Sequence, residues 1–95
     1  MRTRLTMIAA VCLALLGLSF NSQALQRGMA AFSRRDFQAA EREFKEAVRA
    51  EPASAHVWKL LGMTYIAQEK YEAAEDPCRR ACDLDPHQEN ACYYW

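Results

Sequence analysis

The chain has 95 residues, with 12 basic and 12 acidic side chains and no net charge. This length allows one small domain, and the balanced charge excludes the basic surface of a nucleic-acid-binding protein. Three glycines and three prolines are too few for a linker-rich or disordered chain. A chain this short also buries too little surface for a large internal active site.

Residues 1–24 have the parts of a secretory signal peptide. Arg2 and Arg4 precede an apolar run over residues 5–20, and a small-x-small cleavage pattern ends at Ala24. The run is shorter than the roughly 20 residues that a membrane-spanning helix needs. We therefore expect cleavage after Ala24 and a bacterial-type exported protein, periplasmic or secreted. The alternative is an uncleaved segment that anchors the chain in a membrane.

The rest of the chain repeats itself with a shift of 34 residues. Small residues fall on small residues and large on large, and a proline closes each period. The aligned pairs include Gly28 with Gly62, Met29 with Met63, Phe37 with Tyr71, Ala40 with Ala74, Glu41 with Glu75, Ala47 with Ala81 and Pro52 with Pro86. A fixed period of this length is the sequence signature of a stacked repeat architecture.

Each period predicts two short amphipathic helices joined by a tight connection. Apolar residues recur at helical spacing, as in Trp58, Leu61 and Tyr65. The expected helices cover residues 25–34, 37–50, 55–68 and 71–84. Ser54 is placed to cap the third of these helices.

The motif Trp58-x2-Leu61-Gly62-x2-Tyr65, followed by Ala74, Ala81 and Pro86, resembles the tetratricopeptide repeat. The resemblance covers nearly all of residues 25–95. It implies an all-α fold, an α-solenoid of antiparallel helix pairs with two repeats and the start of a third. Repeat 1 spans about 25–54, repeat 2 about 55–88 and a partial third repeat about 89–95. Cys78 departs from the pattern, because it stands where repeat 1 has Phe44.

Two local features lead to specific expectations about packing. The small pairs Gly28 with Ala40 and Gly62 with Ala74 should let paired helices approach closely. Pro77 falls inside the fourth expected helix, where a proline disturbs hydrogen bonding. We expect Asp76 to cap a helix that restarts at Pro77.

The C-terminal residues resemble the opening of a third repeat that stops at Trp95. We expect a truncated fragment, in which an uncovered apolar end favours self-association. The alternatives are a complete short protein whose aromatic tail folds back, or a tail that is itself a docking surface.

The cysteines allow several interpretations. Cys78 and Cys82 share one helix face, and Cys92 begins the next helix, so either could form a disulfide with Cys92 or fill the core as a thiol. Together with His87 they offer four zinc ligand types, although the spacing matches no usual zinc finger. His56 and His87 are interpreted as solvated turn residues. No catalytic set, phosphate loop or cofactor motif is present, so we expect no enzyme activity, metal or cofactor.

The repeat geometry predicts a mainly apolar concave groove lined by the first helix of each pair. Its candidate residues are Met29, Phe32, His56, Lys59, Met63, Ile66, Asn90 and Tyr93. The predicted function is a non-enzymatic scaffold that binds a peptide or protein segment in this groove. The alternatives are a thiol or metal protein using Cys78, Cys82, His87 and Cys92, or the recruiting module of a larger enzyme truncated after Trp95.

Overall fold

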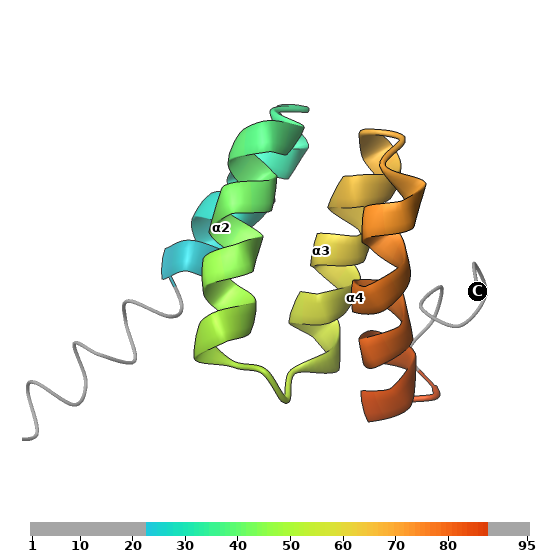
Figure 1. Ribbon diagram of the computed structural model, residues 1–95. Coiled ribbons are helices and arrows are strands. Elements are labelled where there is room, and N and C mark those ends of the chain that lie inside the picture. The colour runs from blue at the N-terminus through green and yellow to red at the C-terminus, as the bar shows by residue number, and fades with distance from the viewer. Residues whose placement is uncertain (1–22, 88–95) are drawn as a thin grey trace, which may run out of the picture.

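The computed structural model describes residues 23–87, and these residues form helices joined by short connections (Figure 1). The first helix covers residues 23–33, and α2 (Phe37–Ala50), α3 (Ala55–Ala67) and α4 (Tyr71–Leu84) follow. No strand occurs within the described part of the chain. The all-α fold and the four helices predicted from the repeat are confirmed, to within two residues at each end.

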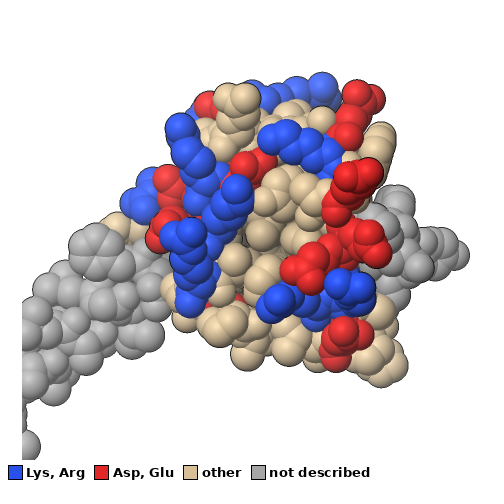
Figure 2. All heavy atoms as spheres, in the orientation of Figure 1, with Lys and Arg blue, Asp and Glu red and all other residues tan. Residues whose placement is uncertain are grey.

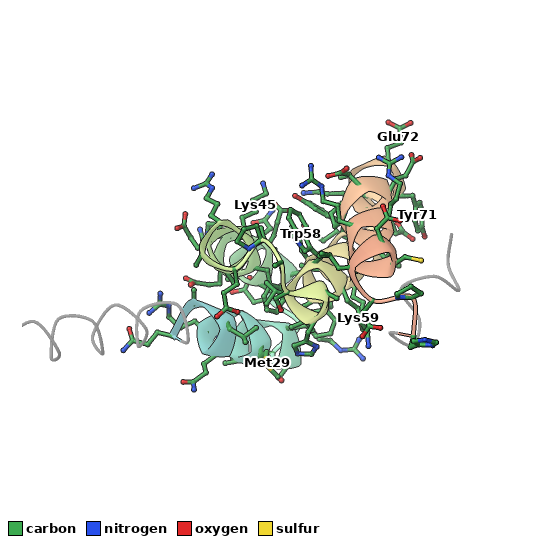
Figure 3. All side chains as sticks on the ribbon, turned by 90° about the horizontal axis from the view of Figure 1, so that it is seen from below. Met29, Lys45, Trp58, Lys59, Tyr71 and Glu72 are labelled. Atoms are coloured by element: carbon green, nitrogen blue, oxygen red, sulfur yellow. The ribbon has the colours of Figure 1, made fainter. Side chains whose placement is uncertain are left out.

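The helices form two layers. The first helix and α3 make one layer, and α2 and α4 make the other (Figure 3). Each helix runs antiparallel to its sequence neighbour, whereas α2 and α4 run in the same direction (Figure 1). The second pair therefore repeats the first, as the 34-residue period requires.

The core lies where α2 and α3 meet the first helix. Phe44, Ala40 and Val57 are almost fully buried there, with Leu61 beside them. Trp58 and Tyr65 are partly buried and pack against the same cluster. Removing a buried phenylalanine ring such as that of Phe44 typically costs about 3–5 kcal/mol. The core thus depends on one aromatic ring surrounded by small residues.

Two glycines bring paired helices into close contact at equivalent places. A Cβ atom on Gly28 would lie 2.6 Å from Cε1 of Phe44, and one on Gly62 would lie 2.5 Å from Sγ of Cys78. Phe44 and Cys78 are themselves one period apart. The prediction of close approach at Gly62 is confirmed, but its nearest neighbour is Cys78 rather than Ala74, one turn earlier on α4.

The connections within the two helix pairs share the same backbone conformation at their equivalent residues. Arg35 and Glu69, again one period apart, have φ angles of 62° and 60°. In each turn the next N–H donates to a carbonyl five residues back, from Asp36 to Ala31 and from Lys70 to Tyr65. This is the Schellman pattern, which satisfies carbonyls at the end of a helix. The turns reverse the chain within two or three residues and fix the antiparallel pairing.

Side chains cap two of the helices. Ser54 accepts a hydrogen bond from the backbone N–H of Val57, which confirms the predicted cap of α3. Asp36 accepts one from Ala39 in the same way at the start of α2. Such a cap satisfies one of the unpaired N–H groups at a helix start.

Pro77 does not restart a helix, so that prediction is wrong. α4 is continuous from Tyr71 to Leu84 with Pro77 inside it and buried. Asp76 does not cap it; its carboxylate binds Arg79 and Arg80 instead. Pro77 leaves the carbonyl of Ala73 without its helical donor. Because Ala73 is exposed, water can replace that donor while the proline ring gains burial.

Several expectations fall on residues outside the described range. These are the signal peptide apart from Gln23 and Ala24, the partial third repeat, and Asn90, Cys92 and Tyr93. Ala24, at the expected cleavage site, is helical and belongs to the core cluster. None of the helices described is long and apolar enough to cross a membrane.

The Gly62–Cys78 contact can be tested with a pair of substitutions. Gly62→Ala should lower the free energy of unfolding by about 1–3 kcal/mol, because the added methyl overlaps the Cys78 sulfur. In a Cys78→Ala background the same change should cost clearly less. Chemical denaturation of the four proteins measures this coupling. Equal costs in both backgrounds would contradict the contact.

Candidate binding surface

The predicted groove residues lie on the layer formed by the first helix and α3. Lys59, Met63 and Ile66 follow one stripe of α3 and are half-buried, and His56 at the start of that stripe is exposed. Met29 on the first helix is 47% exposed. Met29 and Lys59 lie on the same side of the molecule, away from Lys45 and Glu72 (Figure 3). Met29 and Lys59, from the two helices of this layer, therefore lie on one face of the molecule (Figure 3).

Phe32 has a partly structural role. Its ring packs edge-on against Phe37, with centroids 5.2 Å apart and planes at 69°. It also contacts the core cluster. Only part of its ring is therefore left to line a groove. Asn90 and Tyr93 lie outside the described residues.

The predicted thiol and metal ligands do not converge within the described residues. Cys78 is buried, and Cys82 is disulfide-bonded. His87 is exposed. No group of three or more histidine, cysteine or acidic side chains in the range 23–87 is arranged to hold a metal ion.

The opposite face of the molecule contains a groove between α2 and α4, with aromatic residues of α3 as its floor. The guanidinium of Arg80 lies 4.9 Å from the Trp58 ring centroid, and the ammonium of Lys45 lies 5.9 Å from that of Tyr65. The indole N–H of Trp58 donates to the carbonyl of Pro52 at 2.7 Å. Lysine and arginine side chains predominate over α2, and acidic side chains predominate over α4 with a basic patch among them; uncharged residues lie between the two helices (Figure 2).

One end of this groove forms a pocket of about 230 Å³. Its lining consists of Pro52, Trp58, Arg80, Asp83 and Leu84. The Trp58 ring is held by its hydrogen bond and by the stacked Arg80, so this wall of the pocket is preorganised.

Glu41 joins α2 to the connection between α3 and α4. Its carboxylate accepts hydrogen bonds from Gln68 at 3.1 Å and Lys70 at 3.2 Å, and pairs with Lys45 at 3.2 Å. Burial opposes ionisation, but these hydrogen bonds outweigh it and hold the pKa of Glu41 below its usual value. The bond to Glu41 in turn raises the pKa of Lys45. Glu41 is thus an electrostatic link between the two repeats.

Sequence reasoning did not find the α2–α4 groove or the Glu41 link. Glu41 and Lys45 are four residues apart, a spacing that on its own indicates only an exposed ion pair along one helix face. Gln68 and Lys70 lie 27 and 29 residues away, so only the packing of the second pair on the first brings them to Glu41.

Two stacked antiparallel helix pairs with equivalent turns and equivalent glycine contacts define a helical-repeat protein of the α-solenoid class. A family model described as tetratricopeptide repeat matches residues 25–89. The chain belongs to the tetratricopeptide repeat family. Such repeats generally mediate protein–protein interaction as non-enzymatic scaffolds and bind protein partners. A comparison with curated proteins finds no match.

The Glu41 link makes stability depend on pH in a defined direction. Because its folded-state pKa is lowered, its contribution is complete above the unfolded-state value of about 4.5 and is lost as the pH falls through the lower folded-state value. Glu41→Gln should cost about 0.5–1 kcal/mol at pH 7, and the difference from the native chain should vanish in acid. Denaturation curves at several pH values measure it.

Glu75→Gln is the matched control, because Glu75 occupies the equivalent position of the second repeat, is exposed and has no ion pair among the described residues. The Glu41 link would be contradicted if Glu41→Gln lowered the free energy of unfolding by the same amount as Glu75→Gln. It would also be contradicted if the effect of Glu41→Gln did not change with pH.

Proposed function

We propose that the layer formed by the first helix and α3 binds an extended or helical apolar segment of a partner protein. The family supports protein binding in general, and the stripe Lys59, Met63 and Ile66 with the exposed Met29 supports an apolar ligand. Methionine side chains are flexible and polarisable, which suits binding of apolar side chains. Lys59 adds one cation that would favour a carboxylate near the apolar residues.

The observation that carries this proposal is that Met29 on the first helix is exposed, while the stripe Lys59, Met63 and Ile66 on the neighbouring α3 is only half-buried. A methionine that is 47% exposed contributes little to the core, yet the next repeat has Met63 at the equivalent position. The two methionines, at equivalent positions of one layer, offer flexible apolar side chains in both repeats.

The proposal is tested by selecting peptides against the full chain from a random peptide library and mapping the binding site by NMR. Shifts should concentrate at Met29, Lys59, Met63 and Ile66. Met63→Glu should weaken binding by at least about tenfold, because it places a charge among apolar contacts. Glu75→Gln, on the other layer, is the control and should leave affinity unchanged. Shifts confined to α2 and α4 would contradict the proposal.

We further propose that the protein is exported, with a signal peptide at residues 1–24. The basic residues Arg2 and Arg4, the apolar run and the small-x-small pattern support it. The disulfide at Cys82 agrees with an oxidising compartment. Intact mass spectrometry of the protein from its native host should show the loss of residues 1–24. A membrane-bound chain with an intact N-terminus would favour the anchor instead.

A further inference from the structure

The outward-facing sides of α2 and α4 carry complementary charge patterns at equivalent positions. We call the three charged residues on each of these sides the crest of that helix. On α2, Arg42, Glu46 and Arg49 form a stripe with the order positive, negative, positive. On α4, the residues 34 positions later are Asp76, Arg80 and Asp83, with the order negative, positive, negative. Spacings of four and three residues place each set on one helix face. All six side chains are exposed.

These charges are only partly neutralised within their own helices. Arg49 pairs with Glu46, and Asp76 pairs with Arg79 and Arg80. Arg42 and Asp83 have no ion pair among the described residues. Each crest therefore keeps an unpaired charge of its majority sign at one end, which agrees with the separation of basic and acidic side chains over the two helices (Figure 2).

We propose that this face pairs with the same face of a second copy of the chain, independently of the peptide-binding function proposed above. A two-fold axis parallel to α2 and α4, in front of the face shown in Figure 1, places α2 of each copy opposite α4 of the other. The two helices then run in the same direction and at the same level. Each residue of one crest meets its equivalent 34 positions away in the second copy.

In this pairing Arg42 faces the partner's Asp76, Glu46 faces the partner's Arg80, and Arg49 faces the partner's Asp83. The three pairs occur twice because the interface is two-fold symmetric. Lys45 and Arg79 form one like-charged exposed pair in this arrangement and oppose it, although Lys45 is paired with Glu41 and Arg79 with Asp76 in their own chain. The three opposite-charge pairs of the crests outnumber this one. A shift of one turn brings like charges together, so the pattern also fixes the register.

The same arrangement also buries the uncharged residues that lie between the two crests. Trp58 and Tyr65 are only half-buried, and Leu84 at the edge of the pocket is 45% exposed. A second copy would shield this strip from water. Because most of the attraction comes from exposed charges, the association should be weak and sensitive to salt.

Sedimentation equilibrium of the full chain at low ionic strength tests the proposal. The native chain should dimerise, and the dimer should weaken by about tenfold or more between 0.05 and 0.5 M salt. Reversing the α2 crest with Arg42→Glu, Glu46→Arg and Arg49→Glu should abolish the dimer. Reversing the α4 crest with Asp76→Arg, Arg80→Glu and Asp83→Arg should do the same. Circular dichroism confirms that each variant remains helical.

Mixing the two reversed variants is the decisive experiment. Each crest then again meets its opposite pattern, so the mixture should form a heterodimer although neither variant dimerises alone. A single chain with both crests reversed should dimerise like the native one. Glu75→Lys is the charge control for α4, because Glu75 is not a crest residue and lies about 80–140° around the helix from Asp76, Arg80 and Asp83. Its effect should be small compared with that of either crest reversal.

Three results would overturn the proposal. The first is that the native chain is monomeric at low salt, and the second is that the mixture of reversed variants stays monomeric. The third is that association persists unchanged in both reversed variants. The last result would assign self-association to another surface, such as the apolar C-terminal end expected from the sequence.

Discussion

The close approach of paired helices at two equivalent glycines is the constraint on which the rest of the structure depends. At Gly28 the space where a side chain would stand is filled by the ring of Phe44, and at Gly62 it is filled by the sulfur of Cys78. Both contacts join the first helix of a pair to the middle of the second. Because the interior of a protein is close-packed, the helices cannot separate or rotate without losing these contacts.

This pairing produces two faces of different character. The first helix and α3 present methionines and other apolar side chains in register, while α2 and α4 present charged crests on either side of an aromatic floor. The Glu41 link then joins the pairs, because it ties α2 to the connection before α4. The same 34-residue period that builds the fold therefore aligns Met29 with Met63 on one face and Arg42 with Asp76 on the other.

The sequence was sufficient for the fold because periodicity, prolines and turn lengths all agree. It was insufficient where tertiary packing outweighs local preference. Pro77 disfavours a helix interior, yet its burial and the exposure of Ala73 let α4 continue through it. The repeat pattern pairs the small residues Gly62 and Ala74 and so predicts that Ala74 is the closest neighbour of Gly62. The way in which α3 and α4 pack instead brings Cys78 closest. Glu41 could not be linked to Gln68 and Lys70, because contacts across nearly a whole repeat leave no local pattern.

The most direct test of the close helix approach is the nuclear Overhauser contacts of the two glycines. The Gly28 Hα protons should show strong cross-peaks to the ring protons of Phe44, and the Gly62 Hα protons to the Hβ protons of Cys78. Both sets should disappear together when the chain unfolds. If either glycine instead shows cross-peaks only to its own helix, the helices do not meet at these positions and the account of the fold fails.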